Sequence, residues 1–523
     1  MRGDLEWGTI PKLMLRAAEE DGTRSAIVDT EAIHTLSFGE LAARSLRVAG
    51  GFVAMGIQRG DRVAIWAPNM WEWIVAALGL QAAGAALVPL NTRYKGREAA
   101  YILARSGAKA LVTVRGFLDT DFPAMLDGHA IPTLRHTIIM RGHAEPGEMT
   151  LSDLSAVGTV EQARARIEEI DPNDASDILF TSGTTGNPKG VVCTHAQTLR
   201  TFTEWTAVVG LEARDRYLVV NPFFHAFGYK AGWLSGLIRR CEIYPHPVFD
   251  PAAVLKRIPR DRISMLPGPP TLFQKLLLDP GLPRANLSSL RLAVTGAAVI
   301  PTSLIREMRT TLGFNTVITG YGLTEACGVA TMCRFDDDEE TIAKTSGRAI
   351  EGTEVQVVDD DGDEVPRGEP GEVLIRGYNV MTHYFDDPDA TAQAVTKDGW
   401  LKTGDIGVMD ARGYLRITDR KKDMFIVGGF NAYPAEIENI LLDHPAVGQV
   451  AVVGAPHPKM GEVGVAFVVP IPGMTPTSDA IIEWSREQMA NYKVPRRVEM
   501  VDSLPTNALG KVTRYVLKER AAQ

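Results

Sequence analysis

The sequence contains few of the residues that would place it in several common protein classes. Only four of its 523 residues are cysteine, namely Cys193, Cys241, Cys327 and Cys333, and their spacing fits neither a disulfide framework nor a zinc site. Such sparse cysteine is typical of the reducing cytosol, so we expect a cytoplasmic protein. The 64 acidic residues outnumber the 55 basic ones and give a net charge of -9, which argues against a nucleic-acid partner.

Long hydrophobic runs and repeats are missing as well. The first residues, MRGDLEWGTIPKL, lack the basic-then-apolar pattern of a signal peptide. The most apolar stretch runs from Ile74 to Leu90, and Gln81 and Pro89 interrupt it. It is too short and weak for a membrane span, so we expect a buried helix that leads into a strand. No internal repeat or low-complexity tract is found in the sequence.

What is present is the composition of a large globular protein, 45% hydrophobic and 23% charged, with more than one domain expected from its length. Short apolar runs alternate with helical patterns up to about residue 418, short strands and turns occur near 355–378, and the last hundred residues read as a separate α+β unit. We therefore predict an α/β protein. Its large N-terminal domain, 1–418, combines layered α/β subdomains with a β-rich subdomain, and a hinge at 419–422 joins it to a small mobile α+β domain at 423–523.

One glycine-rich loop is the most informative segment. Residues 181–190 read TSGTTGNPKG and lie between two strand-like runs, at 178–180 and 190–194. Such a loop lets backbone N–H groups, hydroxyls and a lysine surround phosphate oxygens. It is not a Walker A loop, because Lys189 precedes the last glycine, and its apolar flanks argue against a flexible linker.

Two further predicted strands, at 292–295 and 317–319, run into glycine-bearing loops, Gly296-Ala297-Ala298 and Gly320-Tyr321-Gly322. In open α/β sheets, ligands bind outside the carboxyl ends of the strands. The three loops together therefore predict one shared nucleotide site. A helix is expected over 195–209, with Thr194 as its N-cap.

In order along the chain, seven motifs resemble those of the adenylate-forming superfamily, which contains acyl-CoA synthetases, firefly luciferases and adenylation domains. They are TSGTTGNPKG, NPFFHAFGYKAG (221–232), TGAAVIP (295–301), GYGLTEA (320–326), WLKTGDIG (400–407), ITDRKKDMFIVGGFNAYPAEIE (417–438) and NALGKV (507–512). The resemblance covers nearly the whole chain. It implies that a carboxylic acid reacts with ATP to an acyl-adenylate, and that the thiol of coenzyme A then displaces AMP.

The resemblance also implies a nucleotide-binding role for a set of residues. These are Thr181, Ser182, Gly183, Thr184, Thr185, Gly186 and Lys189 around the β- and γ-phosphates, Thr324 at the α-phosphate, Gly296, Ala297, Ala298, Gly320, Tyr321 and Gly322 around adenine, and Asp405 with Arg420 at the ribose. Glu325 is expected to hold Mg²⁺, with a surface salt bridge as the ordinary alternative. Tyr321 has the alternative of a core tyrosine, and Asp405 and Arg420 that of a structural ion pair.

Three segments of the C-terminal region take their expected roles from the same resemblance. Lys511 is the adenylation lysine, which bridges the carboxylate and the α-phosphate. Lys422 is the hinge about which the C-terminal domain rotates between the two half-reactions. Gly428, Gly429 and Phe430 then line the channel for the pantetheine arm of coenzyme A.

The acid is expected to contact the 221–232 motif. His225 borders the carboxylate in the family, although a histidine among aromatics is often only a core group. Phe227, Lys230 and Ala231 are expected in the acyl pocket, with Lys230 either a lysine at the pocket rim or a donor to a substrate oxygen. No Asp or Glu occurs from 221 to 238, which favours a hydrophobic acid without an amine.

Within the superfamily, PNMWEW (68–73), VPLNTRY (88–94) and DRKKDMFIVGGFNAYPAE (419–436) resemble actinobacterial acyl-CoA ligases of steroid degradation. These activate a propanoate side chain on an indane-dione ring skeleton. The open alternatives are a general medium- or long-chain fatty acyl-CoA synthetase, a stand-alone enzyme that loads a carrier protein, a luciferase-type oxidase and a non-catalytic nucleotide-binding protein. The expected partners are a carboxylic acid, ATP and coenzyme A, with no membrane span, and the choice between monomer and homodimer stays open.

Overall fold

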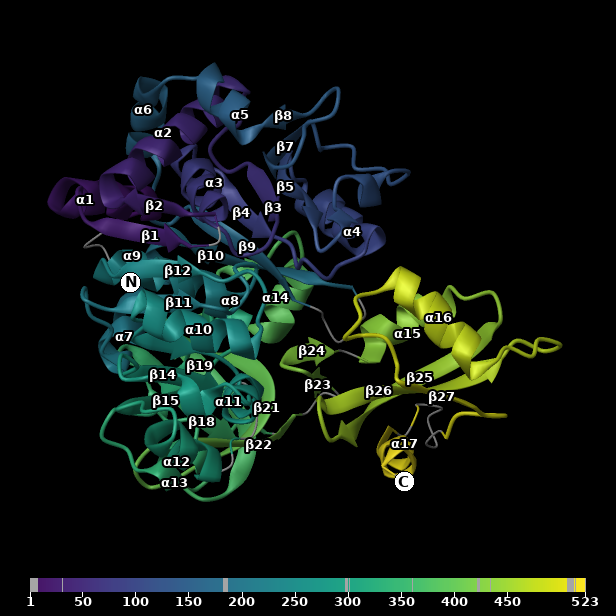
Figure 1. Ribbon diagram of the computed structural model, residues 1–523. Coiled ribbons are helices and arrows are strands. Elements are labelled where there is room, and N and C mark those ends of the chain that lie inside the picture. The colour runs from purple at the N-terminus through teal and green to yellow at the C-terminus, as the bar shows by residue number, and fades with distance from the viewer. Residues whose placement is uncertain are drawn as a thin grey trace. The chain divides into compact units, whose positions relative to one another are not determined.

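The computed structural model describes residues 8–30, 32–181, 187–296, 300, 302–359, 361–420, 424–432, 434–505, 512 and 514–522. They form two compact units (Figure 1). The first comprises residues 1–92, 103–179 and 190–418, and the second comprises 93–102, 180–189 and 419–523. Phosphate-loop, adenine and ribose motifs are therefore distributed over both units.

One large sheet carries the phosphate-loop strands. Its order is β20 (His383–Tyr384), β10 (Lys189–Thr194), β9 (Ala175–Thr181), β4 (Ala86–Pro89), β3 (Arg62–Trp66), β5 (Ala110–Phe117), β7 (His136–Arg141) and β8 (Met149–Thr150), and β6 (Thr120–Asp121) pairs with β5. The central strands β4, β3, β5 and β7 are parallel, and strands β3 and β4 are almost wholly buried. Burial on both faces explains why these strands appear in the sequence as continuous apolar runs.

The second large sheet carries the strands of the adenine motifs. Its order is β17 (Arg348–Ala349), β16 (Thr331–Met332), β15 (Thr316–Tyr321), β14 (Leu292–Gly296), β13 (Met265–Pro267), β11 (Arg216–Val219), β12 (Glu242–Pro245), β1 (Ser25–Asp29) and β2 (His34–Ser37). Strands β15, β14, β13, β11, β12 and β1 pair in parallel. The expectation of layered α/β subdomains is confirmed.

Helices cover these sheets. They are α1 (Ile10–Asp21), α2 (Phe38–Ala54), α3 (Trp71–Ala82), α4 (Gly96–Ser106), α5 (Leu151–Val157), α6 (Val160–Glu169), α7 (His195–Val209), α8 (Ala226–Gly228), α9 (Ser235–Arg239), α10 (Pro251–Asp261), α11 (Pro270–Leu277), α12 (Thr302–Thr310), α13 (Glu339–Lys344) and α14 (Pro388–Ala394). Shorter turns of helix are η1 (Ala124–Leu126), η2 (Tyr229–Leu234), η3 (Leu282–Arg284) and η4 (Thr324–Ala326). Helices α1, α5 and α6 each pack against α2 (Figure 1).

Two of the sequence expectations for helices are confirmed. Helix α7 begins at His195 with Thr194 as its N-cap, and Gln197 completes a capping box. The apolar stretch from Ile74 forms the buried helix α3, followed by strand β4. Helices α2 and α3 pack closely at Gly79, where a Cβ would lie 2.5 Å from Val48 Cγ1. No helix among the described residues has the length and apolar character needed to cross a membrane.

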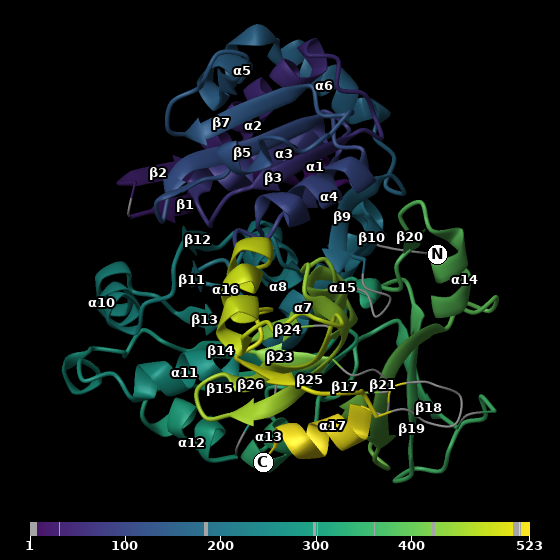
Figure 2. The same cartoon turned by 90° about the vertical axis from the view of Figure 1, so that its right-hand side faces the viewer.

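The predicted β-rich subdomain is a four-stranded antiparallel sheet. Its order is β18 (Thr353–Val358), β19 (Pro370–Gly377), β21 (Leu401–Met409) and β22 (Leu415–Arg420). Figure 2 shows β18, β19 and β21 side by side, as their pairing requires. Asp405 lies in the middle of β21, so the rigid sheet fixes its position.

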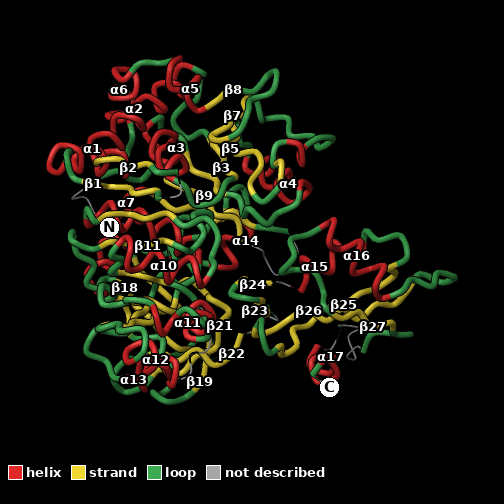
Figure 3. Tube along the Cα trace, viewed as in Figure 1, coloured by secondary structure: helices red, strands yellow, loops and turns green. Residues whose placement is uncertain are grey.

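The C-terminal part of the second unit is an α+β sandwich. Its sheet has the order β24 (Phe430–Ala432), β23 (Phe425–Val427), β26 (Gly461–Pro470) and β25 (Val447–His457), with β27 (Arg497–Met500) beside β26. Helices α15 (Pro434–Leu442) and α16 (Ser478–Gln488) cover one face and α17 (Arg514–Ala521) the other (Figure 3). Alternate residues of β25 serve the two faces, since Val452 packs with the first core and Val453 with the second.

All four cysteines are free and buried. Three of them, Cys193, Cys327 and Cys333, lie close to the nucleotide motifs along the chain.

Candidate active site

The phosphate-loop motif lies largely outside the described residues. Thr181 ends β9 and Lys189 begins β10, so both ends of the loop are strand residues. The positions between them that carry the predicted phosphate contacts, Ser182, Gly183, Thr184, Thr185 and Gly186, are not among the described residues. Their role therefore stays a prediction.

The strands that enter the adenine motifs are longer than the sequence suggested. Gly296 is the last residue of β14, and Gly320 and Tyr321 still belong to β15. The expectation that Gly320 and Tyr321 lie in a loop was therefore wrong. Gly320 lets β16 approach, since a Cβ there would lie 2.8 Å from the carbonyl oxygen of Thr331.

The glycine-bearing strands belong to two sheets rather than one. Strand β9 lies in the sheet with β4 and β10, whereas β14 and β15 are neighbours in the other large sheet. Ala297 and Ala298 are outside the described residues. Gly322 is exposed just after β15, where a Cβ would meet the backbone of Gly328 at 2.3 Å, so only glycine fits.

The structure brings Tyr321 and Asp405 together. The Tyr321 hydroxyl donates a hydrogen bond of 2.6 Å to Asp405 Oδ2. The Asp405 side chain is buried, 5% exposed, whereas Tyr321 is half-buried. A flat ring and a carboxylate held by one hydrogen bond suit a ligand with a planar base and neighbouring hydroxyl groups. Arg420 ends β22, and its side chain lies outside the described part of the structure.

Glu325 lies in the short helix η4, directly after Thr324. Both residues are half-buried, and Glu325 Oε1 accepts a 2.8 Å hydrogen bond from the Tyr384 hydroxyl. The backbone of Met381 donates to the Glu325 carbonyl oxygen at 2.8 Å, which fixes the turn. Sequence reasoning missed Tyr384, because nothing local links β20 to η4.

A single carboxylate of this kind suits Mg²⁺. Among the described residues, no group of three or more His, Cys, Asp or Glu side chains forms a ready-made metal cage. Magnesium usually binds through one or two carboxylates together with substrate phosphates and water. Glu325 fits that pattern, since the hydrogen bond that its carboxylate accepts comes from a neutral hydroxyl group, that of Tyr384.

His225 caps the three-residue helix α8. Its Nδ1 accepts a hydrogen bond of 3.2 Å from the backbone N–H of Phe227, which assigns the proton of the neutral ring to Nε2. The side chain is exposed, so the alternative of a core histidine is wrong. Desolvation by the surrounding protein still lowers its pKa, and the ring is neutral near pH 7. Its Nε2–H is then a donor suited to a carboxylate.

Asn69 fixes the segment that carries His225. Its side-chain amide donates to the carbonyl oxygens of Val219 (3.1 Å) and Asn221 (2.9 Å), and its Oδ1 accepts from the backbone of Phe223 (2.8 Å). Asn69 is 4% exposed. It belongs to the PNMWEW motif, which was noted for its resemblance and not for this role.

The neighbouring residues that are predicted to line the acyl pocket follow in the segment η2 and just before it. Phe227 is half-buried and Ala231 is 4% exposed. Gly228 permits the tight turn, because a Cβ there would lie 2.1 Å from the carbonyl oxygen of Pro222. Tyr229 and Trp233 stack within the core at 5.1 Å. The segment is kinked at Gly232, whose φ of -83° and ψ of -110° are not helical.

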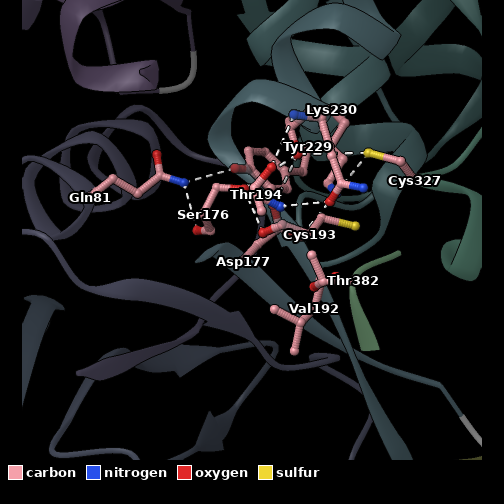
Figure 4. A network of polar contacts seen from close by, with 12 residues as sticks. Gln81, Ser176, Asp177, Val192, Cys193, Thr194, Tyr229, Lys230, Cys327 and Thr382 are labelled. Atoms are coloured by element: carbon pink, nitrogen blue, oxygen red, sulfur yellow. Dashed lines mark hydrogen bonds and ion pairs between the residues drawn. The ribbon is translucent and has the colours of Figure 1, made fainter. Parts of the chain in front are cut away.

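Lys230 is neither at a rim nor exposed. Its side chain is 1% exposed, and its Nζ lies 2.9 Å from Oδ1 of Asp177, which is fully buried on β9 (Figure 4). The expectation of a rim lysine was therefore wrong, because the ammonium is buried with its stem. Burial alone lowers the pKa of Lys230, but the Asp177 carboxylate outweighs it, and the pKa is raised well above its usual value.

Sequence reasoning also missed Asp177. It noted that no acidic residue occurs from 221 to 238, yet the fold places this carboxylate beside that segment from 53 positions away. The argument against a substrate with an ammonium group still holds, but for a different reason. The Asp177 carboxylate is already paired with the Lys230 ammonium.

In the second unit, Gly428 and Gly429 form the turn of the β23–β24 hairpin. Both have positive φ, 57° and 87°, and Val427 pairs with Phe430 across them. Two central residues with positive φ define a type I′ turn, which explains the Gly-Gly pair without any ligand. Phe430 stacks on Tyr492 at 4.9 Å. Lys422, the predicted hinge residue, and Lys511, the predicted adenylation lysine, lie outside the described residues.

The sequence is similar to known proteins along most of its length. The sequence matches the AMP-binding enzyme family over residues 14–385 and the AMP-binding enzyme C-terminal domain over 436–511. It is 46% identical, over 98% of both chains, to the 3-[(3aS,4S,7aS)-7a-methyl-1,5-dioxo-octahydro-1H-inden-4-yl]propanoyl:CoA ligase of Mycobacterium tuberculosis. The ligase of the same name from Rhodococcus jostii is also 46% identical over 98% of both chains.

The fold has solved counterparts too. The o-succinylbenzoate CoA synthetase of Bacillus subtilis, bound to a product analogue, is 28% identical over 98% of this chain and 99% of its own, with a TM-score of 0.83. The predicted superfamily and fold are thus confirmed over the whole length. This protein belongs to the AMP-binding enzyme family.

Proposed function

We propose that this protein is an ATP-dependent acid–CoA ligase that activates a propanoate side chain on a partly degraded steroid ring system. The observation that carries the proposal is the 46% identity, along 98% of both chains, to two indane-dione propanoyl:CoA ligases. The reaction has two steps. The carboxylate first attacks the α-phosphate of ATP and expels pyrophosphate, and the thiol of coenzyme A then attacks the acyl-adenylate and releases AMP.

The described residues support the nucleotide half of this reaction. Tyr321 presents its ring to adenine, and Asp405 accepts hydrogen bonds from the ribose hydroxyls, while their mutual hydrogen bond sets the angle between them. Thr324 contacts the α-phosphate. Glu325 would hold Mg²⁺, which supplies positive charge next to the triphosphate. Thr184, Thr185 and their neighbours in the phosphate loop are proposed to hold the β- and γ-phosphates.

The acid half is proposed to rely on His225, Phe227 and Ala231. The Nε2–H of His225 suits one carboxylate oxygen, and the two other residues supply apolar surface to a ring skeleton. The buried carboxylate of Asp177, which lies against this segment, is paired with Lys230. This favours an uncharged hydrophobic body for the acid.

A panel of acids tests the substrate assignment. Purified protein receives ATP, Mg²⁺ and coenzyme A with an indane-dione propanoate, a medium-chain fatty acid, a long-chain fatty acid or a hydroxycinnamate, and AMP and the CoA thioester are quantified. We expect the highest kcat/KM for the indane-dione propanoate. A higher value for a fatty acid would instead support the general fatty acyl-CoA synthetase. Adenylate formation without thioester would indicate a carrier-protein acceptor, and no turnover of any acid would overturn the ligase proposal.

The role of Lys511 is tested by separating the half-reactions. Lys511→Ala removes the cation that is proposed to bridge the carboxylate and the α-phosphate, so acid-dependent ATP–pyrophosphate exchange should fall by about 100- to 1000-fold. CoA transfer from a synthetic acyl-adenylate should be retained, because Lys422 lets the C-terminal domain turn and brings Gly428, Gly429 and Phe430 to the pantetheine arm. Equal loss of both half-reactions would contradict this assignment. Lys459→Ala is a matched control, since Lys459 is an exposed lysine of the same domain.

A further inference from the structure

A buried polar cluster connects three motifs that are far apart in the sequence. Lys230 follows the His225 motif, Asp177 lies on the strand that enters the phosphate loop, and Cys327 directly follows η4, which holds Thr324 and Glu325. All three side chains are at most 1% exposed. Figure 4 shows them within one network of polar contacts. They belong to the same compact unit.

The contacts of the Lys230 ammonium define the cluster. Nζ lies 2.9 Å from Asp177 Oδ1 and donates to Cys327 Sγ at 3.4 Å. Thr198 on α7 contacts both partners, at 3.5 Å from Asp177 Oδ2 and 3.7 Å from Cys327 Sγ. Ser176 donates a 2.7 Å hydrogen bond to Asp177 Oδ2 and thereby holds the carboxylate in place. The ammonium therefore bridges a strand and a turn.

The turn at Cys327 needs such support. Cys327 has a φ of 56°, in the left-handed region that residues other than glycine rarely adopt. Its backbone N–H bonds to the carbonyl oxygen of Thr324, so the position of Cys327 is coupled to that of the η4 turn. A shift of the sulfur is therefore transmitted to Thr324 and Glu325.

We propose that Lys230 is a positioning residue, which acts through Asp177 and Cys327 to hold Thr324 and Glu325 in register with the strand that enters the phosphate loop. This inference rests on the proposed function, because Thr324 and Glu325 take their roles from it. It reassigns Lys230, which the sequence placed in the acyl pocket. In this role the ammonium sets the geometry for the nucleotide and Mg²⁺ and makes no contact with the acid.

The proposal predicts a selective kinetic defect. Cys327→Ala leaves the Lys230–Asp177 ion pair intact but removes its contact with the turn. Misplacement of groups on the scale of an ångström costs up to about 100-fold in rate, so we expect acid-dependent ATP–pyrophosphate exchange to fall by about 10- to 100-fold. The KM for MgATP should rise, and the KM for the acid should not change. Cys241→Ala is the matched control, because Cys241 is a free, fully buried cysteine outside the cluster.

A second set of variants removes the charges. Lys230→Met leaves Asp177 unpaired, and the double variant Lys230→Met/Asp177→Asn leaves no buried charge. We expect the double variant to regain the melting temperature that the single variant loses. The rate of ATP–pyrophosphate exchange should stay low in both variants, because neither has an ammonium group that contacts both the strand β9 and the turn at Cys327. If the double variant regains both, Lys230 serves stability alone and the proposal is wrong. If Lys230→Met does not fold, Cys327→Ala and the double variant decide.

Two related acids separate the proposal from direct substrate recognition. The variants are assayed with an indane-dione propanoate and with its analogue that lacks the ring ketones. A KM increase confined to the diketone would mean that Lys230 binds a ketone, which would overturn the positioning role. An equal exchange rate in wild type and Cys327→Ala would overturn it as well. Absence of exchange in the wild type, by contrast, would overturn the proposed function itself.

Discussion

Each of the two units buries a lysine almost completely, yet the two ammonium groups have different surroundings. Lys230 in the first unit shares its hydrogens between one carboxylate and one sulfur. Lys493 in the second unit, also 1% exposed, lies 2.6 Å from Glu436 and 2.7 Å from Glu98. The Lys230 ammonium therefore has one carboxylate partner, and the Lys493 ammonium has two.

The comparison separates a cluster that serves the site from one that serves the fold. The ring centroids of Tyr94 and Tyr492 lie 4.8 and 5.6 Å from Lys493 Nζ, so aromatic faces complete its surroundings. Burial alone lowers the pKa of Lys493, but Glu436 outweighs it and raises that pKa well above its usual value. No predicted nucleotide or metal residue lies within ten positions of Lys493 that the structure describes, whereas Cys327 lies two positions after Glu325.

The largest effect is expected from Lys493→Met. Removing one partner of a buried ion pair typically costs about 3–5 kcal/mol, because the remaining charges stay unpaired in a dry site. The rate of amide hydrogen exchange in α15 and β26 should therefore rise by the factor that corresponds to this loss of free energy. Peptides of the first unit should keep their protection. The exposed Lys459→Met is the control. A loss below about 1 kcal/mol would show that water reaches the cluster, which would make it an ordinary surface pair.

Local signals in the sequence predicted the elements on which these clusters stand. Thr194 and the apolar spacing after it predicted the first residue of helix α7, and the apolar runs predicted strands β9 and β14. These predictions succeed because helix capping and strand burial depend on residues that are neighbours in the sequence. The superfamily motifs identified Tyr321, Glu325 and Asp405, and the structure joins the first and third by a hydrogen bond.

Long-range partners were beyond the reach of such signals. The pairs Lys230–Asp177 and Glu325–Tyr384 join residues 53 and 59 positions apart. They arise from the order of strands in two sheets, and periodicity within one segment contains no information about that order. The end of β15 was missed for a related reason, since Tyr321 stays in the strand only because Thr331 pairs with it.

Each of two buried histidines of the first unit should make stability depend on pH, by a smaller amount than the loss expected from Lys493→Met. In the first unit, burial lowers the pKa of His195 to about 4, and burial together with Arg257 lowers that of His246 to about 4. The unfolded chain binds these protons near pH 6.5, so it holds more protons than the folded state between about pH 6.5 and pH 4. Stability is therefore lost as the pH falls through that range, by about 3 kcal/mol for each histidine.

His195→Asn tests this expectation. The Asn side chain keeps an acceptor for the backbone N–H of Ile10, which bonds to His195 Nδ1, but it does not titrate. Urea unfolding at a series of pH values should show a shallower loss of stability in this variant below pH 6.5. His143→Asn, at an exposed position, should leave the slope unchanged. An identical slope in His195→Asn and wild type would mean that His195 is already solvated in the folded state.

The smallest effect compares one turn from each unit. Gly428 (φ 57°) turns the β23–β24 hairpin, and Gly413 (φ 81°) lies between β21 and β22. Alanine at a left-handed position costs about 1–2 kcal/mol, so Gly428→Ala and Gly413→Ala should lose similar stability in thermal unfolding. A Cβ on Gly428 would also lie 2.7 Å from Met460 Cε, whereas nothing lies within 4 Å of one on Gly413.

If the Gly428 turn lines the path of coenzyme A, only Gly428→Ala should also raise the KM for coenzyme A, with pyrophosphate exchange unchanged. Equal KM values in both variants would mean that the two glycines serve only the turn, and that coenzyme A enters elsewhere.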